Sequence, residues 1–297
     1  MLSRAMKRSL SIVGAGRVGR TLGKRLHRLG WRIGAVVTRS AATSRIAVQE
    51  IGAGKPHSRL VPAIFDSSVI LLTTPDGALS GIAGALAKFD EMKLRGKIVL
   101  HTSGALDRTV LAPLARRGAS TGSIHPMQTF TGRGTPKLER AIFAVEGDRS
   151  AAIVARKIAR SLGGVPVTIN SKNKPAYHAA GALVAGHGLG LIEAATQVLM
   201  KIGFSRRNAM RALLPLMRQM LDNFEQLGPR ESWTGPVSRG DFATVAKHTK
   251  ALRSYPSEFN EAHAALALLA NRVLSKNSGV ASKQLKRALR KSTGGKS

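Results

Sequence analysis

The sequence of 297 residues predicts an α/β domain with a doubly wound parallel sheet, followed by an all-α domain. Three observations predict this fold class. Short apolar runs alternate with helical segments as far as residue 170, helical segments alone follow, and a glycine-rich loop joins the first run to the first helical segment. Alternating strands and helices place parallel strands in one sheet with helices on both faces.

Seven apolar runs are the expected strands. They are separated by segments of helical period such as "RVGRTLGKRLHRLG" and "GALSGIAGALAKF". The runs are "LSIVGA", "RIGAVVTR", "SVILLTTP", "KIVLHTS", "STGSIHPM", "AIFAVEG" and "VPVTIN". We expect them to form one parallel sheet within residues 1–170.

The second half of the chain shows four helical segments and no strand pattern. They cover residues 175–203, 205–228, 241–253 and 257–276, with Ser205 and Asp241 as N-caps. We therefore predict a helical domain over 171–275. The basic, polar segment 276–297 is expected to be a disordered tail.

Composition narrows the class of protein. The chain is 43% apolar but only 4% aromatic, which favours an aliphatic interior over an aromatic-rich β-sandwich. The absence of cysteine excludes disulfides, thiolate zinc sites and cysteine nucleophiles, and fits a cytoplasmic protein. No spacing typical of a metal site is present. The apolar stretch "AAGALVAGHGLGLIEAATQVL" contains His187 and Glu193, so we expect a buried helix and no membrane contact.

The formal net charge of +31 raises the possibility of a nucleic-acid partner. The charge is spread evenly, with 24 basic and 9 acidic residues in 1–150 and 23 and 7 in 151–297. No basic stripe or interleaved aromatic residue marks a dedicated surface. A general basic bias, with no specific nucleic-acid partner, is the preferred interpretation.

The loop "GAGRVG" has the spacing G-x-G-x-x-G of a dinucleotide-binding turn. Gly14 would make the tight turn, Gly16 would let a pyrophosphate approach the backbone, and Gly19 would let the helix pack against the strand. The free N–H groups at the helix N-terminus would bind the phosphates. A glycine turn without a ligand is the alternative.

The second expected strand indicates which dinucleotide is bound. It ends in Thr38, Arg39 and Ser40, whereas an NAD site has an acidic residue at this place. A guanidinium and two hydroxyls suit a 2′-phosphate, so we predict NADP; the alternative is that Arg39 is a surface arginine. The expected cofactor contacts are Gly14, Gly16, Arg17, Val18, Gly19, Thr38, Arg39, Ser40, Thr74 and Pro75.

Polar residues follow three expected strands, where a parallel sheet binds its ligands. They lie in "TTPD", "HTSG" and "SIHPM". Each has a local alternative: Asp76 as a helix N-cap, His101 as a buried histidine with satisfied hydrogen bonds, and the Ser103-Gly104 pair as a turn. From these stretches we take Ser103 and His125 as catalytic candidates and Thr102 as a substrate contact.

The start of the helical half supplies the other candidates. Lys174 and His178 are four residues apart on one helix face, with Tyr177 beside them. The helix dipole disfavours a lysine at this end, which points to a functional reason for Lys174. Lys174 and His178 are candidate proton donors and Tyr177 a substrate contact. Alternatively, Lys174 points into solvent and His178 packs between the domains.

A Gly/Pro-rich loop, "TGPVSRGD", interrupts the helical half. Arg239 and Asp241 in it are candidate substrate contacts, with Arg239 suited to a carboxylate or phosphate. The alternative is a helix connector capped by Asp241. In the preceding helical segment, the small residues Gly181, Gly186, Gly188 and Gly190 allow close helix approach, so we expect a homodimer through the helical domain.

Together, "IVGAGRVG", "TTPD", "HTSGAL", "GSIHPMQTF", "YHAAG" and "TGPVSRGD" resemble a bacterial family of Rossmann-like NADP oxidoreductases with a C-terminal helical domain of unknown function. The resemblance runs from about residue 9 to 270. The layout is similar to pyrroline-5-carboxylate reductases, 3-hydroxyisobutyrate dehydrogenases and 6-phosphogluconate dehydrogenases, whose helical domain pairs in a dimer. By this resemblance, Lys174 takes the place of the catalytic lysine of the hydroxyacid dehydrogenases, whereas His178 stands where those enzymes have asparagine.

The resemblance implies an NADP-dependent oxidoreductase that transfers a hydride between nicotinamide and a small carbonyl, imine or hydroxy acid held between the domains. Two departures put its proton relay in doubt: His178, and Gly186 where the family tends to have asparagine. "HPM" also resembles prephenate dehydrogenases, so that class stays open. A non-catalytic NADP sensor or scaffold is the second hypothesis, and a nucleic-acid-binding protein is the third.

Overall fold

The computed structural model describes residues 8–132, 134, 136–276 and 278–290. The chain forms two compact units, Met1–His187 and Gly188–Ser297, which we describe separately. Strands end and helices take over near residue 170, as expected, but the first compact unit extends to His187. The reason is that the first turns of the next helix contact the sheet through Lys174 and Tyr177.

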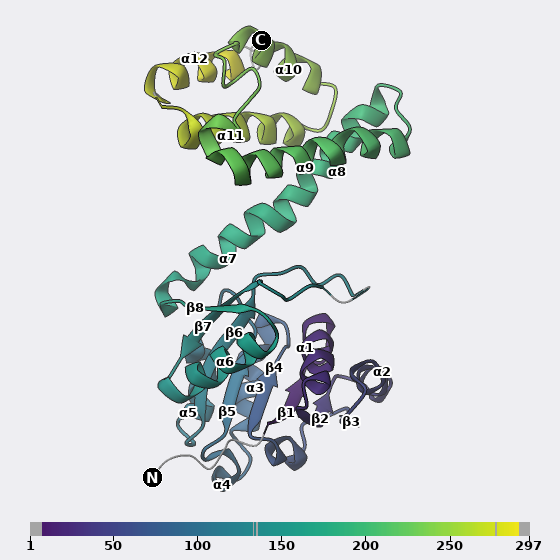
Figure 1. Cartoon of the computed structure of the whole chain (residues 1–297), viewed down its shortest axis with the longest axis vertical. Coiled ribbons are helices and arrows are strands. Elements are labelled where there is room, and N and C mark those ends of the chain that lie inside the picture. Colours follow the sequence, from purple (N-terminus) through teal and green to yellow (C-terminus); the bar gives the residue numbers. More distant parts are fainter. Residues whose placement is uncertain (1–7, 133, 135, 277, 291–297) are drawn as a thin grey trace. The chain divides into compact units, whose positions relative to one another are not determined.

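The first unit is built on one sheet of eight strands in the order β3-β2-β1-β4-β5-β6-β7-β8 (Figure 1). This is the predicted parallel sheet with helices on both faces, with two differences given below. The strands are β1 Ser9–Val13, β2 Arg32–Val37, β3 Lys55–His57, β4 Val69–Leu72, β5 Ile98–His101, β6 Ser120–Pro126, β7 Ile142–Gly147 and β8 Val165–Thr168.

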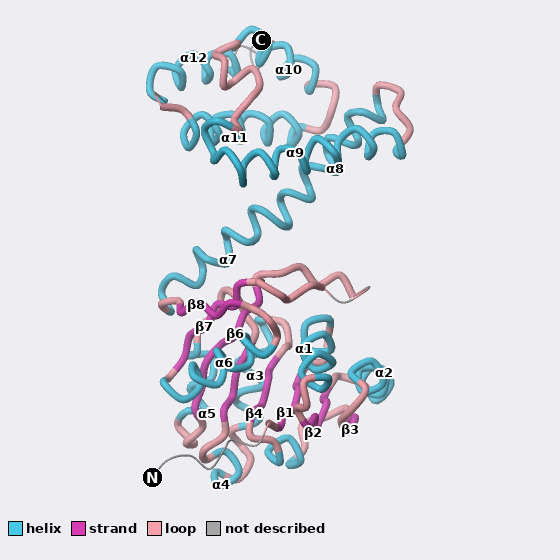
Figure 2. The backbone as a smooth tube through the Cα atoms, viewed as in Figure 1, coloured by secondary structure: helices cyan, strands magenta, loops and turns pink. Residues whose placement is uncertain are grey.

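Helices cover both faces of this sheet (Figure 2). They are α1 Arg17–Arg28, α2 Ala41–Ile51, α3 Asp76–Leu86, α4 Glu91–Leu94, α5 Ala112–Ala115 and α6 Arg149–Ser161, with 3₁₀ turns η1 Pro62–Asp66, η2 Arg108–Leu111 and η3 Ser171–Asn173. Neighbouring residues of β4 belong to different cores, because side chains alternate across a sheet. Val69 and Leu71 pack with α1, α2 and α6, whereas Ile70 and Leu72 pack with α3 and α5. Burial on both faces explains the continuous apolar runs.

The sheet differs from the prediction at three strands: β7 and β8 are parallel to each other but run opposite to the other six, and β3 is an additional strand. Strand β7 pairs antiparallel with β6, with Ser123 opposite Glu146, because residues 127–141 return the chain without a helical crossover in the part that the structure describes. Strand β3 was not expected. Its three residues, Lys-Pro-His, include no residue typical of a buried strand, and proline is tolerated there because β3 is an edge strand.

The chain leaves the sheet through helix α7, Lys174–Ala182, which continues into a π-helical segment, Leu183–His187. Among its described residues, the second unit then has helices and no strand: α8 Gly188–Lys201, α9 Arg206–Glu231, α10 Phe242–Leu252, α11 Ser257–Leu274 and α12 Ser278–Arg290. Both predicted caps are confirmed, since Ser205 Oγ accepts from the Asn208 N–H at 3.2 Å and Asp241 Oδ1 from the Thr244 N–H at 3.0 Å.

The prediction of a disordered tail is wrong for residues 278–290, which form α12. Its apolar residues Leu285 and Leu289 are buried with Val245 of α10 and Ala267 of α11, so the basic composition hid an amphipathic helix. Residues 291–297 lie outside the described residues. One helical stretch of those described, 171–201, is long and apolar enough to cross a membrane by length and composition, which is weak evidence for a span. The expectation that this apolar stretch forms a buried helix is wrong for the single chain, in which only 6% of its apolar window is buried.

Candidate active site

The glycine loop lies between β1 and α1 and is held against the end of β4. Gly14 has φ +90°, and a Cβ atom there would lie 2.8 Å from the Thr74 backbone nitrogen. The Thr73 hydroxyl donates to the Gly14 carbonyl at 2.7 Å, which fixes the turn. A Cβ at Gly19 would lie 3.2 Å from the Gly14 carbonyl, so the third glycine serves close packing of the helix.

The N-terminus of α1 is open. Gly16 is the N-cap residue and no side chain accepts from the first N–H groups of the helix. A Cβ atom at Gly16 would meet only the Gly14 carbonyl, at 3.8 Å, so there is free space in front of these groups. Such an end attracts an anion, through the unpaired N–H donors and the helix dipole.

A pocket of about 800 Å³ opens beside this loop. Among the residues predicted to contact the cofactor, seven line it: Gly14, Gly16, Thr38, Arg39, Ser40, Thr74 and Pro75. The Thr74 hydroxyl oxygen is buried without a hydrogen-bond partner, which suits a site completed by a ligand. Arg17, Val18 and Gly19 do not line the pocket. Arg17 lies beside Gly132, and Val18 packs against the core.

The far end of the pocket carries hydroxyls and two arginines. Ser40 caps α2 by accepting from the Thr43 N–H at 3.2 Å, and the Thr38 and Thr43 hydroxyls are 2.6 Å apart. Arg39 and Arg59 both line the pocket. The sequence analysis missed Arg59 because the short strand before it, β3, carries no apolar pattern. Its place in "PHSR", two residues beyond that strand, was the available signal.

The strand ends that were expected to meet do lie at one edge of the sheet. In the parallel ladders, Val13 is opposite Leu72, Leu72 opposite His101, and His101 opposite Ser123. The residues that follow these positions are therefore neighbours at the carboxyl edge. This brings the glycine loop, Thr74, Ser103 and His125 to the same side of the first unit.

Ser103 is engaged in three hydrogen bonds. Its hydroxyl donates to the Asp76 carboxylate at 2.8 Å and accepts from the Ala105 and Leu106 N–H groups at 3.2 and 2.9 Å. The expectation that Asp76 caps α3 is wrong, because Pro75 occupies the N-cap position and Asp76 the first turn. Ser103 thus fixes the loop after β5.

His101 is buried with satisfied hydrogen bonds, which confirms the structural role given as the alternative to a role in the site. Its Nδ1 accepts from the Ser103 N–H at 3.2 Å, so Nε2 carries the proton and donates to the Asp107 carbonyl at 3.1 Å. Burial and the nearby Lys174 ammonium lower the pKa of His101 to about 4. Thr102 donates its N–H to the Leu72 carbonyl at 3.1 Å and is half-buried at the edge.

Lys174, the first residue of α7, is completely buried, which contradicts the alternative that it points into solvent. Its ammonium donates to the Ser103 carbonyl at 3.0 Å and to the Ser123 hydroxyl at 2.8 Å. Burial lowers the pKa of Lys174 to about 8, and the carboxylates of Glu146, Asp107 and Asp76 oppose this shift. The lysine therefore fixes α7 to β5 and β6.

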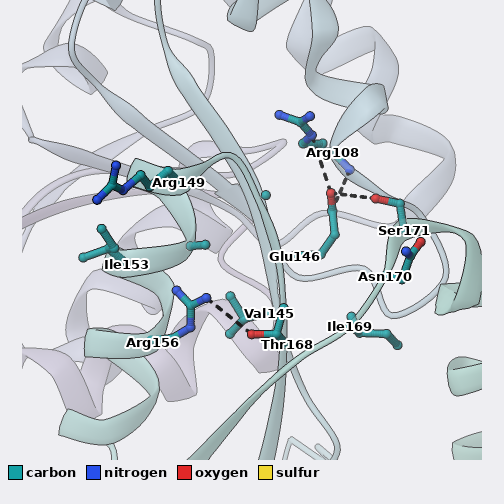
Figure 3. A pocket seen from close by; sticks show the side chains of 12 residues that line it. Arg108, Val145, Glu146, Arg149, Ile153, Arg156, Thr168, Ile169, Asn170 and Ser171 are labelled. Atoms are coloured by element: carbon teal, nitrogen blue, oxygen red, sulfur yellow. Dashed lines mark hydrogen bonds and ion pairs between the residues drawn. The ribbon is translucent and has the colours of Figure 1, made fainter.

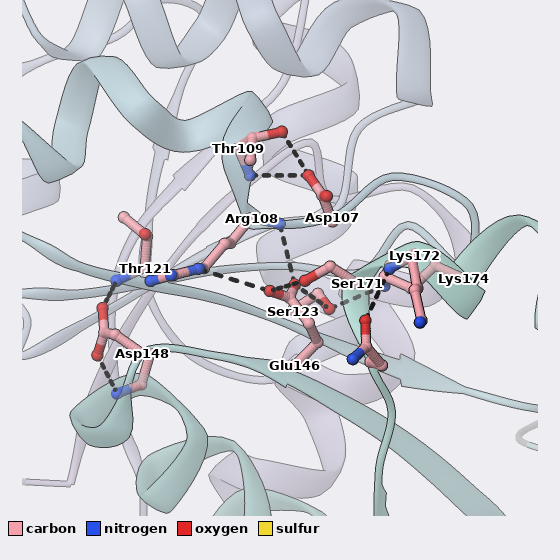
Figure 4. A network of polar contacts seen from close by, with 12 residues as sticks. Asp107, Arg108, Thr109, Thr121, Ser123, Glu146, Asp148, Ser171, Lys172 and Lys174 are labelled. Carbon is pink, nitrogen blue, oxygen red and sulfur yellow. Dashed lines mark hydrogen bonds and ion pairs between the residues drawn. The ribbon is translucent and has the colours of Figure 1, made fainter.

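The sequence analysis missed Glu146, a buried carboxylate in β7 (Figure 4). It accepts from the Arg108 N–H at 2.9 Å and the Ser171 hydroxyl at 3.0 Å, and Ser123 Oγ lies 3.5 Å away. Ser123 thus lies between the Lys174 ammonium and the Glu146 carboxylate. The signal in the sequence was an acidic residue that interrupts the apolar run "AIFAVEG".

Three ring side chains form a cluster in front of Gly104. His125 Nδ1 lies 3.0 Å from the Tyr177 hydroxyl, and the rings of His125 and His178 meet edge to face at 5.9 Å. A Cβ atom at Gly104 would lie 2.8 Å from His125 Nε2, so only glycine fits there. Burial first, and then the charge of Lys174, lower the pKa of His125 to about 4, whereas burial raises that of Tyr177 to about 12.

The structure therefore brings Ser103, His125, Lys174, Tyr177 and His178 together in the first unit. His178 is exposed and Tyr177 half-buried, so these two groups face solvent. Arg239 and Asp241 belong to the second unit. Asp241 caps α10, as expected of a helix connector. The hydrogen bonds from Thr244 lower the pKa of the Asp241 carboxyl. Arg239 is exposed in the preceding loop.

A parallel βαβ sheet with a glycine turn and an uncapped first helix defines a Rossmann-like domain, here followed by a helical region. Family models agree: residues 3–126 match a Rossmann-like domain and residues 141–272 a domain of unknown function, DUF2520. The chain thus combines a Rossmann-like domain with DUF2520. None of the curated proteins compared with the chain matches it.

Solved structures share the fold along nearly the whole chain. A Bacteroides fragilis protein provisionally called an NADP oxidoreductase is 21% identical, with a TM-score of 0.73 over 88% of this chain and 97% of its own. An Aspergillus terreus reductive aminase in complex with NADPH is 18% identical, with a TM-score of 0.59 over 99% and 97%. A Streptomyces aurantiacus imine reductase is 15% identical, with a TM-score of 0.66 over 97% and 100%.

Proposed function

We propose that the protein is an NADP-dependent oxidoreductase that transfers a hydride between nicotinamide and a small carbonyl, imine or hydroxy acid. The observation that carries the proposal is the pocket of about 800 Å³, which runs from the uncapped end of α1 to Arg39 and Arg59. Its two ends have the chemistry of a pyrophosphate site and of a 2′-phosphate site. The related reductive aminase, whose structure holds NADPH, is consistent with this cofactor.

The residues present fit NADP. The N–H groups that begin α1 would bind the pyrophosphate, Gly16 leaves it room, and the unpartnered Thr74 hydroxyl would gain a hydrogen-bond partner. Arg39, Arg59 and the Ser40 hydroxyl would bind the 2′-phosphate. Bound NADPH would supply the hydride; the chain itself must supply the proton.

We propose that His178 donates that proton, with Tyr177 holding the substrate oxygen or nitrogen by its hydroxyl. Both groups face solvent, and an imidazole N–H and a phenol O–H can each donate to a bound substrate. Tyr177 stays protonated as a donor because burial raises its pKa to about 12. His125 stays neutral beside Tyr177, because burial and, after it, the charge of the Lys174 ammonium lower the pKa of His125 to about 4.

Calorimetry with NADPH and NADH tests the cofactor proposal. Removing the Arg39 guanidinium in Arg39→Ala should weaken NADPH binding roughly 10-fold or more and leave NADH binding nearly unchanged. The matched control is Arg45→Ala, which removes an exposed arginine of α2 outside the pocket. An equal loss for both nucleotides, or the same loss in the control, would contradict the assignment of the 2′-phosphate end.

A screen of small ketones, imines and hydroxy acids for NADPH oxidation or NADP reduction tests the chemistry. With a substrate that the screen identifies, His178→Gln should lower kcat by about 100-fold with little change in KM, whereas Tyr177→Phe should mainly raise KM. Tight NADPH binding without turnover of any substrate would favour the second hypothesis, a non-catalytic NADP sensor.

We further propose that the protein forms a homodimer through its helical region. Large apolar side chains of α8 and α9 are exposed in the single chain, with Leu189 at 68%, Leu216 at 67% and Phe224 at 53%. Cβ atoms at Gly186 and Gly190 would meet nothing within 4 Å, which leaves room for a partner helix. Light scattering after gel filtration should give twice the mass of 31.5 kDa, and Leu216→Glu should shift it to the monomer.

A further inference from the structure

A second cavity, of about 520 Å³, lies in the first unit at the ends of β7 and β8 (Figure 3). We call it the arginine cavity, after Arg108, Arg149 and Arg156 in its wall. It does not share a lining residue with the pocket beside the glycine loop, which we call the nicotinamide pocket after its proposed cofactor. Arg149 and Arg156 come from α6, and Arg108 from η2.

The three guanidinium groups have most of their donors unused. Arg149 has no hydrogen-bond acceptor among the described residues, and Arg156 donates only to the neutral Thr168 hydroxyl, at 3.3 Å. Arg108 reaches the Glu146 carboxylate with Nε at 3.7 Å. Other arginines bind carboxylates more closely, as Arg20 does with Glu50 at 2.7 Å. A guanidinium has five N–H donors, so each of the three can still accept an anion.

The nearby carboxylates do not cancel this charge. Glu146 is buried, accepts from the Arg108 N–H and the Ser171 hydroxyl, and is balanced by the Lys174 ammonium behind Ser123. Asp148 caps α6, and its oxygens accept from the N–H groups of Ser150, Ala151 and Thr121. The charged residues that line the cavity are therefore three arginines and one carboxylate, Glu146, which already has hydrogen-bond partners.

Unpaired arginines are common in a chain with 47 basic and 16 acidic residues, so the cavity itself must distinguish these three. Here the guanidinium groups of the exposed Arg108 and Arg149 and of the half-buried Arg156 line one open cavity. Its wall also contains the apolar side chains of Val145, Ile169 and Ile153, the last of which is 55% exposed. The combination of a cationic wall and an apolar wall is typical of sites for amphipathic small molecules.

We propose that the arginine cavity is a second ligand site, which binds a small organic anion with one phosphate or carboxylate group and an apolar remainder. The anionic group would lie among Arg108, Arg149 and Arg156, where charge-assisted and bidentate hydrogen bonds are strong. The apolar part would cover Ile153. The site is independent of the nicotinamide pocket, so it does not require that the proposed oxidoreductase function be correct.

Calorimetry with phenyl phosphate and benzoate, and with benzyl alcohol as an uncharged counterpart, tests the proposal. One or both anions should bind and the alcohol should not, and the preferred anion distinguishes phosphate from carboxylate recognition. Arg149→Gln/Arg156→Gln should weaken binding at least 10-fold. The matched control is Arg160→Gln, which removes the same charge from an exposed position of α6 outside the cavity.

Amide NMR spectra locate the ligand. The shifts should occur at Gly147 and Asn170 in the cavity wall and not at Gly14, and saturating NADP should leave anion binding unchanged. Failure of both anions to bind at millimolar concentration would overturn the proposal. So would equal losses in the Arg160 control, or displacement of the anion by NADP.

Discussion

Two strand–helix–strand units of the first compact unit, β1-α1-β2 and β7-α6-β8, have the same topology but different helix ends. Helix α1 begins at Gly16 without any side-chain cap, whereas Asp148 accepts from the first N–H groups of α6. The carboxylate of Asp148 thus occupies in α6 the place that is left open in α1. The difference teaches that backbone N–H groups at a helix N-terminus are left for a ligand at α1, whereas at α6 the chain satisfies them itself.

The neighbouring cavities differ accordingly. The pocket at α1 offers backbone N–H groups and a glycine surface in addition to Arg39 and Arg59, while the cavity at α6 offers arginine side chains beside a capped helix. Backbone donors are fixed in direction and suit one ligand geometry, whereas guanidinium groups on flexible stems adapt to several anions. The predictions below test this comparison in order of expected size.

The largest effect is expected from a Cβ atom at Gly14. Gly14→Ala should lower the free energy of unfolding by roughly 4 kcal/mol, because the added atom would lie 2.8 Å from the Thr74 nitrogen and the residue has φ +90°. Gly16→Ala, where the nearest atom is 3.8 Å away, should cost less than about 1 kcal/mol. Urea denaturation measures both; similar losses would mean that the turn is not held against β4.

The second prediction concerns Lys174, which Ser123 links to Glu146 of β7. Below about pH 8, the pKa of Lys174 in the folded chain, the lysine is protonated in both the folded and the unfolded chain. Between about pH 8 and its ordinary pKa of 10.5, only the unfolded chain keeps the proton. Stability relative to Lys174→Met should therefore rise by roughly 3 kcal/mol between about pH 8 and 10.5.

Urea denaturation across this pH range measures the difference between wild type and Lys174→Met. The exposed neighbour Lys172 provides the control, since Lys172→Met should show no such rise. A difference between wild type and Lys174→Met that does not change with pH would show that the ammonium is not desolvated.

The third prediction gives α1 the cap that α6 has. Gly16→Asp should fold, because the position is open, and its carboxylate should compete with the pyrophosphate for the N–H groups of α1. NADPH affinity should fall about 100-fold, which calorimetry can measure. Unchanged affinity in a folded Gly16→Asp variant would mean that the phosphates bind elsewhere.

The smallest effect is expected from removing the cap of α6. Asp148→Ala leaves the Ser150, Ala151 and Thr121 N–H groups without their acceptor and should cost about 1 to 2 kcal/mol of stability. Asp148→Asn keeps an acceptor and should cost less. Thermal unfolding of the two variants checks the order, and NADPH affinity should change in neither.

Much of this fold could be predicted from the sequence because apolar runs and glycine spacing are local signals. The direction of β7 could not, since it depends on how residues 127–141 return the chain. Strand β3 carries no apolar pattern, and α12 was hidden by its basic residues, whose apolar face becomes visible only against α10 and α11.

The residues of the candidate site also fall into those that the sequence could predict and those that it could not. The glycine loop, Arg39, His125, Lys174 and Tyr177 follow from motifs and strand ends. Arg59 and Glu146 contribute through contacts across the sheet, which a single sequence does not reveal. Even for Lys174 the sequence indicated importance but not burial, because its burial depends on the Ser103 carbonyl and Ser123 hydroxyl, contributed by distant strands.

With the proposed nucleotide bound at the open end of α1, the stability of the protein would depend on the nucleotide concentration. A nucleotide that binds only the folded chain adds RT ln(1 + [L]/Kd), about 2.7 kcal/mol at a hundredfold excess over Kd. Helix α6 carries its own anion and gains nothing from the nucleotide. Melting temperature should therefore follow nucleotide concentration, and amide exchange should slow in the β1-α1 turn before it slows in the β7-α6 turn.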